Sequence, residues 1–166
     1  NIQEHSLQVV LVAHGLATIR NTYFSGVVDA DRVAVLAAYH EAGEVFTGDL
    51  PTPIKYFNPE IKQAYVAIED FAKGRLQRML PQELQPSFQP LLFPQPAEQE
   101  LWRIVKAADK ICAYLKCVEE LKTGNQEFAK AERSIRQELD QFELPEVRYF
   151  MEHFAPSFGL ALDELN

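Results

Sequence analysis

The sequence predicts an all-α fold, a single helical bundle of about six or more helices. Apolar residues recur at intervals of three and four along nearly the whole chain, which is the spacing of one helix face. No stretch alternates apolar and polar residues as a half-buried strand would. The 166 residues are 47% hydrophobic and 24% charged, which is enough apolar material for one domain with a real core.

The first two expected helices lie in the first third of the chain. Residues 4–20 are so apolar that their helix should lie at the centre of the bundle. Acidic capping residues at 29–31 precede the second helix, which is expected from about Arg32 to Phe46. Gly48 and the prolines that follow it should end this helix, because proline cannot continue one.

A third helix has a clear start signal. Asn58 can cap it, and Pro59 and Glu60 are favoured in a first turn. This helix should run to about Leu80. The next stretch, residues 81–96, holds five of the ten prolines, so we expect a short helical turn and an extended surface loop there.

The remaining sequence predicts three more helices. A long one spans about 97–122 and ends before Gly124, another covers about 126–142, and a short one begins near Pro145. The chain has no internal repeat. Residues 1–166 are therefore expected to form one domain.

Charge and cysteine content argue against several classes of function. A net charge of −8 disfavours nonspecific nucleic-acid binding, which depends on Lys and Arg. No run of about 18 apolar residues is present, so no segment should cross a membrane. Cys112 and Cys117 are five residues apart and match no metal or redox spacing. They are expected to be reduced core thiols of a cytoplasmic protein.

Three ionisable residues interrupt the small, apolar end of the second expected helix. His40 and Glu44 are four residues apart and should share one face, and Glu41 lies about 100° round from His40. Buried charges need partners or a metal, which favours a functional role. The alternative is a helix end with exposed acids.

His5 and Asp109 also stand out, each inside an apolar helical segment. A lone histidine in such a place is more often a satisfied core residue. An aspartate can equally pair with Lys106 or Lys110 on its own helix. The sequence pattern leaves these alternatives open.

The other two histidines are expected to be structural. His14 follows His5 by nine residues and therefore lies on the opposite side of the helix. His153 lies near the end of the chain. If His5, His40, Glu41 and Asp109 converge instead, two imidazoles and two carboxylates could hold a divalent metal that activates water.

Three segments together resemble the HD-domain phosphohydrolases, and within them the bacterial 5'-deoxynucleotidase (YfbR-like) group. The resemblance covers almost the whole chain and is most specific from Gly48 to Pro53 and around Asp109. The segments that carry it are EHSLQV (4–9), YHEAGEVFTGDLPTP (39–53) and KAADKICAYLKC (106–117).

The resemblance implies a ligand set for one divalent metal ion, such as Co²⁺ or Mn²⁺. By position, His5 is the first ligand, His40 the second and Asp109 the last. Glu41 stands where the family has the aspartate of its His-Asp pair.

The resemblance also implies residues that act on the substrate. Glu44 matches the catalytic glutamate of the family, and Asp49 matches an acidic residue that orients substrate or water. Lys55 and Tyr56 are expected to contact a phosphate and a ring, or else to be surface residues.

The chain departs from the family pattern in two places. Glu41 is one methylene longer than aspartate, which would shift the carboxylate by about a bond length. The family's substrate-contacting segment before the first histidine is absent from the numbered chain, and we expect that such a segment exists upstream of Asn1.

The expected function is that of a metal-dependent 5'-deoxynucleotidase. It would hydrolyse deoxynucleoside 5'-monophosphates to nucleoside and phosphate, and the resemblance implies a homodimer. The alternative is a nucleotide-binding or regulatory HD protein in which Glu41, in place of aspartate, has impaired catalysis.

Overall fold

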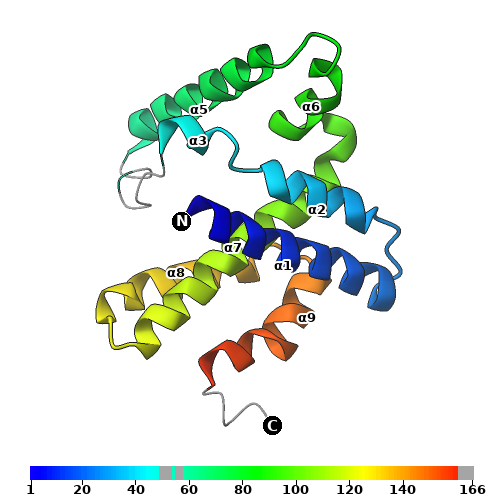
Figure 1. The fold of residues 1–166 in the computed structure, drawn as a ribbon. Coiled ribbons are helices and arrows are strands. Elements are labelled where there is room, and N and C mark those ends of the chain that lie inside the picture. Colours follow the sequence, from blue (N-terminus) through cyan, green and yellow to red (C-terminus); the bar gives the residue numbers. More distant parts are fainter. Residues whose placement is uncertain (49–53, 55–57, 161–166) are drawn as a thin grey trace.

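The computed structural model describes residues 1–48, 54 and 58–160. Every regular element in these ranges is a helix, which confirms the all-α prediction. Figure 1 shows α1, α2 and α7 crossing at the centre, with α8 and α9 on one side and α5 and α6 on the other. The elements are α1 (Ile2–Tyr23), α2 (Ala30–Tyr39), α3 (Glu44–Thr47), α5 (Pro59–Met79), α6 (Gln85–Leu92), η1 (Pro96–Glu98), α7 (Gln99–Lys122), η2 (Gln126–Phe128), α8 (Ala129–Asp140), α9 (Pro145–His153) and η3 (Ala155–Gly159).

The core lies where α1 packs against α2, α7 and α9, so the first helix is central as its composition predicts. Burial of each large apolar side chain there contributes about 1.5–3 kcal/mol relative to leaving it in water. This packing places the start of α1 against the middle of α7. The fully buried apolar side chains of this core include Val9, Leu16, Leu36, Ile104, Ile111 and Leu115.

The predicted end of the second helix is wrong, because α2 ends at Tyr39 rather than continuing to Phe46. Residues 40–43 form a turn, and the four-residue α3 follows it. Backbone hydrogen bonds in this stretch span three residues, as in Ala42 N–H to Tyr39 O (3.0 Å) and Glu44 N–H to Glu41 O (2.9 Å). His40 and Glu44 therefore do not share the face of one continuous helix.

A close packing contact accompanies this break. A Cβ added at Gly43 would lie 3.2 Å from the carbonyl oxygen of Glu69 and 3.3 Å from Cγ of Lys73, both on α5. The chain at Gly43 thus approaches the α5 backbone as only glycine can without displacing a neighbour. The turn is therefore in close contact with α5 at Gly43.

The prolines between 81 and 96 interrupt helix formation less than expected. The eight-residue α6 forms there instead of a short turn, followed by the 3₁₀ turn η1. Pro86 stands in the first turn of α6, where a backbone N–H has no partner within the helix anyway. The start at Asn58 is as predicted, since its side-chain oxygen accepts from Ile61 N–H at 2.8 Å.

Among the described residues, no helix is both long and apolar enough to span a membrane. Cys112 and Cys117 are free and buried on α7, as predicted. Burial raises the pKa of the Cys112 thiol to about 12, and the nearby carboxylates of Asp109 and Glu41 add to the effect. The Cys112 thiol therefore stays protonated near neutral pH.

A buried ion pair ties three helices together. Glu146, in the first turn of α9, is fully buried, and its Oε1 lies 3.8 Å from Nη1 of Arg20 on α1. Nη2 of Arg20 donates to Glu100 on α7 at 3.2 Å. Neither side-chain oxygen of Glu146 accepts a hydrogen bond, so the charge of Arg20 is its main compensation.

Replacing Arg20 by Met should therefore lower the free energy of unfolding by about 3 kcal/mol, because it leaves a buried carboxylate unpaired. The double substitution Arg20→Met, Glu146→Leu should recover most of that loss. Urea denaturation followed by circular dichroism measures both. Lys116→Met, which removes an exposed partner 2.8 Å from Glu120, is the control and should change stability by less than about 0.5 kcal/mol. A double variant no more stable than Arg20→Met would contradict this account.

Candidate metal centre

The packing of α1 on α7 brings His5 and Asp109 together. His5 lies in the first turns of α1, which begins with a capping box between Asn1 and Glu4. Asp109 lies in the middle of α7. Nε2 of His5 is 2.9 Å from Oδ1 of Asp109, within hydrogen-bonding distance. The predicted convergence of these two distant residues is thus present in the structure.

The turn after α2 adds His40 and Glu41 to the same point. Oε1 of Glu41 lies 3.4 Å from Nε2 of His5 and 3.7 Å from Nε2 of His40. Nε2 of His40 lies 3.8 Å from Oδ1 of Asp109. Adjacent residues on a helix point about 100° apart, whereas in this turn His40 and Glu41 reach one site.

The imidazole of His40 is oriented by the backbone. Nδ1 lies 2.7 Å from the carbonyl oxygen of Ala37, and because a carbonyl only accepts, Nδ1 carries the proton. In the neutral ring Nε2 then has the free lone pair, and it faces the cluster. This nitrogen is buried and has no hydrogen-bond partner in the structure. A carbonyl behind one ring nitrogen is the usual support of a metal-binding histidine.

The residues fit a divalent metal. His5, His40, Glu41 and Asp109 each offer one ligand atom, and these four atoms all lie within 4.8 Å of one another. Atoms that bind one metal at about 2.1 Å are about 3–4 Å apart, so small adjustments would complete such a shell. Two imidazole nitrogens with two carboxylate oxygens suit Mn²⁺, Fe²⁺, Co²⁺ or Zn²⁺.

The pKa shifts of the clustered residues indicate that the two carboxylates need positive charge beside them. The hydrogen bond to Asp109, followed by that to Glu41, raises the pKa of His5 from its ordinary 6.5 to about 10. Burial alone would lower the pKa of His40, but the interactions with Asp109 and Glu41 raise it overall. Burial would raise the pKa of Asp109, yet the two histidines hold it well below its ordinary value. Without a cation, protons on the imidazoles compensate the carboxylates.

The alternative explanations for these residues do not hold. The ion pairs that the structure gives Asp109 are with the two histidines, whereas Lys110 pairs with Glu138 at 2.7 Å. His14 is exposed and lies near Asp31 at 3.7 Å, as expected for a structural residue. His153 contacts the ring of Tyr149, with 4.3 Å between ring centroids. Neither His14 nor His153 joins the cluster.

The expected catalytic residues are only partly within the described chain. Glu44 is buried in α3, with 5% of its surface exposed, and follows the ligand turn directly. It is not one of the four clustered groups. Asp49, Lys55 and Tyr56 lie outside the described residues.

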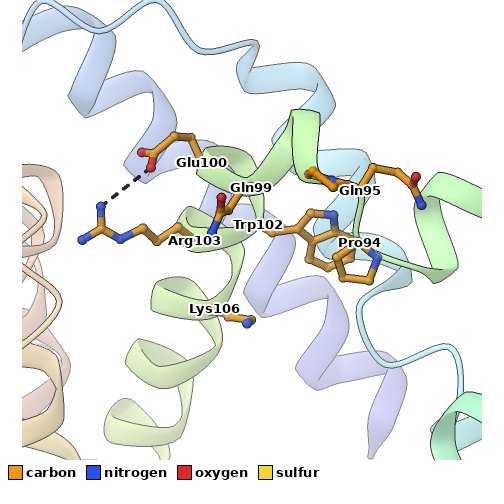
Figure 2. Close-up of a pocket in the computed structure, with 8 residues that line it drawn as sticks. Pro94, Gln95, Gln99, Glu100, Trp102, Arg103 and Lys106 are labelled. Atoms are coloured by element: carbon orange, nitrogen blue, oxygen red, sulfur yellow. Dashed lines mark ion pairs between the residues drawn. The ribbon is translucent and has the colours of Figure 1, made fainter.

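An open pocket of about 640 Å³ lies on the N-terminal half of α7, and the sequence analysis missed it. Its lining includes the cationic side chains of Arg103 and Lys106, and Figure 2 shows Arg103 directed to Glu100, 3.8 Å away. Lys106 precedes Asp109 by three residues, so the two are neighbours on the helix surface. Gln99, Arg103 and Lys106 have the spacing of one helix face, and this spacing could have indicated a polar surface that leads toward Asp109. The full lining is Pro94, Gln95, Pro96, Gln99, Glu100, Trp102, Arg103 and Lys106.

Comparisons with known proteins agree with this geometry. A sequence profile described as 5'-deoxynucleotidase YfbR-like matches residues 1–158. A 5'-deoxynucleotidase of Vibrio vulnificus is 54% identical over 166 residues, which are 100% of this chain and 86% of that protein. The 5'-deoxynucleotidase YfbR of Escherichia coli O1:K1 is 52% identical over the same 166 residues, or 83% of its length.

A solved structure shows the same fold. The HD-domain phosphohydrolase of Listeria innocua superposes with a TM-score of 0.81 over 95% of this chain and 76% of that one. Its sequence is 22% identical, so the likeness concerns the fold alone.

The raised pKa of His5 and the lowered pKa of Asp109 predict how stability depends on pH in chelator-treated protein. The contribution of His5 to the free energy of unfolding is complete below its ordinary pKa of 6.5 and is lost as the pH rises toward 10. That of Asp109 is present above its ordinary 3.8 and is lost as the pH falls below that value. The stability advantage of the native protein over Asp109→Asn should thus be largest near pH 5 to 6 and shrink toward pH 10.

Thermal unfolding in EDTA across this pH range measures the difference. His14→Gln, an exposed histidine of the same helix, is the control and should follow the native trend. An advantage over Asp109→Asn that grows from pH 6 to pH 10 would contradict the assignment of these shifts.

Proposed function

The chain belongs to the YfbR-like family of 5'-deoxynucleotidases, and from this we propose that it hydrolyses deoxynucleoside 5'-monophosphates to nucleoside and phosphate with the help of a metal. The observation that carries the proposal is the convergence of four ligand atoms from α1, α7 and the turn after α2 within 4.8 Å. Relatives that match all 166 residues carry the name 5'-deoxynucleotidase.

We assign the metal to His5, His40, Glu41 and Asp109, with a single divalent ion of the Co²⁺ or Mn²⁺ kind. Such an ion supplies Lewis acidity, which makes water a stronger nucleophile near neutral pH and offsets charge on phosphoryl oxygens. The orphaned Nε2 of His40 and the two carboxylates support this ligand set.

Glu41 takes part in this assignment despite its extra length. Its Oε1 already lies among the other ligand atoms, 3.4 Å from Nε2 of His5. The alternative of a catalytically impaired regulatory protein therefore has no support in the geometry. It has none in the relatives' names either.

Proton transfer is assigned to Glu44. Its carboxylate is buried beside the ligand turn, where a base is shielded from bulk water. It would accept the proton of the attacking water as the new P–O bond forms, and the proton would pass to the 5'-oxygen as the old P–O bond breaks. Asp49 would orient the water or the sugar.

The nucleoside is assigned to the pocket on α7. Lys106 is exposed at its edge, one turn before Asp109, and can meet the phosphate as a point charge. The prolines of the wall offer apolar surface for a base or sugar, whereas the indole of Trp102 is largely buried and contributes only its edge. Lys55 and Tyr56 would complete the phosphate and ring contacts.

We further propose a homodimer, a single domain over residues 1–166 and a cytoplasmic location. Free, buried cysteines are compatible with the reducing conditions of the cytoplasm. Large exposed apolar side chains offer surface for a second copy, and they include Leu7, Leu11, Val66, Phe71 and Met79.

Glu44→Gln should reduce kcat for deoxynucleoside 5'-monophosphates by about 10²–10⁴, because the amide cannot accept a proton. Metal affinity should stay within about twofold of the native value, since Glu44 is not among the four ligands. Phosphate release measures the first quantity and metal titration calorimetry the second. Glu83→Gln, which removes a carboxylate outside the metal-binding group, is the control. Unchanged kcat in Glu44→Gln would exclude its assigned role.

Lys106→Met should raise KM for the nucleotide about tenfold, because a charge-assisted contact contributes about 1.5 kcal/mol. A loss of binding shared by substrate and transition state leaves kcat nearly unchanged. Steady-state kinetics measures both. Lys116→Met removes an exposed lysine of the same helix, paired with Glu120 at 2.8 Å, and should leave KM as it is. Equal KM values for the Lys106 and Lys116 variants would exclude the pocket as the substrate site.

A further inference from the structure

The short helix α3 lies between two sets of residues to which the proposed function gives roles. The ligands His40 and Glu41 come directly before it, Glu44 is its first residue, and Asp49 comes after Gly48 in the sequence. A four-residue helix has one hydrogen-bonded turn and little stability of its own. Its position must be set by what it packs against, and among the described elements it packs mainly against α5.

Gly48 ends α3 in a conformation that only glycine adopts readily. Its φ is +71° and its ψ is 160°, and its N–H donates to the carbonyl of Glu44 at 2.9 Å. Its carbonyl oxygen accepts from two hydroxyl groups. Oγ1 of Thr47 donates at 3.1 Å from within α3, and Oη of Tyr65 donates at 3.3 Å from α5.

The two ends of this segment are thus both held by α5. At the first end, Gly43 fits against the backbone of Glu69 and the side chain of Lys73. At the second end, Tyr65 reaches the carbonyl of Gly48. Tyr65 is 4% exposed, so its hydrogen bond is shielded from competing water.

We propose that Tyr65 is a positioning residue for hydrolysis. Its hydroxyl fixes the carbonyl of Gly48 and with it the end of α3, which sets where Glu44 stands relative to the metal ligands. In this proposal Tyr65 acts through Gly48 rather than on the reacting atoms. This inference rests on the proposed function, because it concerns the same site.

The contact has a consequence that a purely structural role would not have. His5 and Asp109 are held by the packing of α1 on α7, and the ring of His40 is held by the carbonyl of Ala37. None of these supports involves Tyr65, so metal affinity should not depend on it. The pocket for the nucleoside lies on α7, so KM should not depend on it either. The rate of the chemical step should depend on Tyr65, because a small misplacement of a proton acceptor lowers that rate strongly.

The test uses Tyr65→Phe, which keeps the ring and removes only the hydroxyl. We expect kcat for a deoxynucleoside 5'-monophosphate to fall about 10- to 100-fold, with KM and the Mn²⁺ dissociation constant within about twofold of native. A fall in thermal stability with an unchanged kcat per folded molecule would overturn the proposal, as would equal changes in kcat and metal affinity.

Two matched variants sharpen the result. Tyr114→Phe removes a half-buried hydroxyl from α7 and should leave kcat unchanged. Thr47→Val removes the other donor to the carbonyl of Gly48, but that bond is local to α3 and does not connect to α5. Its effect on kcat should be less than about threefold. If Thr47→Val lowered kcat as much as Tyr65→Phe, the link to α5 would not be what matters. The proposed role of Tyr65 would then be wrong.

Amide hydrogen exchange provides a readout that does not need activity. The amides of residues 44–48, including Gly48 N–H, should exchange faster in Tyr65→Phe than in the native protein or in Tyr114→Phe. If the native protein released phosphate from no deoxynucleoside 5'-monophosphate, the proposed function would fail, and exchange alone would judge the contact. Unchanged exchange in this segment would overturn the inference in either case.

Discussion

The packing of α1 against α7 is the constraint on which the rest of the structure depends. It forms the centre of the core and also places Nε2 of His5 2.9 Å from Oδ1 of Asp109. Once these two residues meet, Glu41 brings a second carboxylate to the same point. Two carboxylates in a half-buried site repel each other unless protons or a cation lie between them. The same contact that stabilises the fold therefore creates a demand for positive charge at this point, which protons on the imidazoles or a bound cation can meet.

Most of the fold could be predicted because helices are local structures. Periodicity, caps and prolines located α1, α5 and α7 to within a few residues. The turn at residues 40–43 could not be predicted in this way, since its sequence is small and helix-compatible. In the structure the turn is accompanied by the approach of Gly43 to the backbone of Glu69, a contact between residues that are distant in sequence. An error of this kind matters, because the turn aims two of the four proposed ligands.

The candidate site likewise has a part that could be predicted from the sequence and a part that could not. Residue chemistry and resemblance named His5, His40, Glu41 and Asp109, which the structure brings together. The pocket lining comes from one stretch of sequence, residues 94–96 and the first turns of α7, and its shape depends on the path of the chain through η1, which residue patterns do not define. In the sequence, Lys106 had a simple explanation as a partner of Asp109. Its role at a pocket edge emerges only when the opposite wall is present.

The turn also bears on the proposed role of Glu41, which stands where the resembled family has aspartate. The extra methylene adds about 1.5 Å, which a rigid helix could accommodate only by shifting as a whole. In the turn, the backbone after Tyr39 is held by three-residue hydrogen bonds and is anchored at Gly43 by α5. Within that turn Oε1 of Glu41 lies 3.7 Å from Nε2 of His40, whose ring is fixed by the carbonyl of Ala37. In the proposed ligand set, the position of Glu41 therefore depends on the turn rather than on the register of a helix.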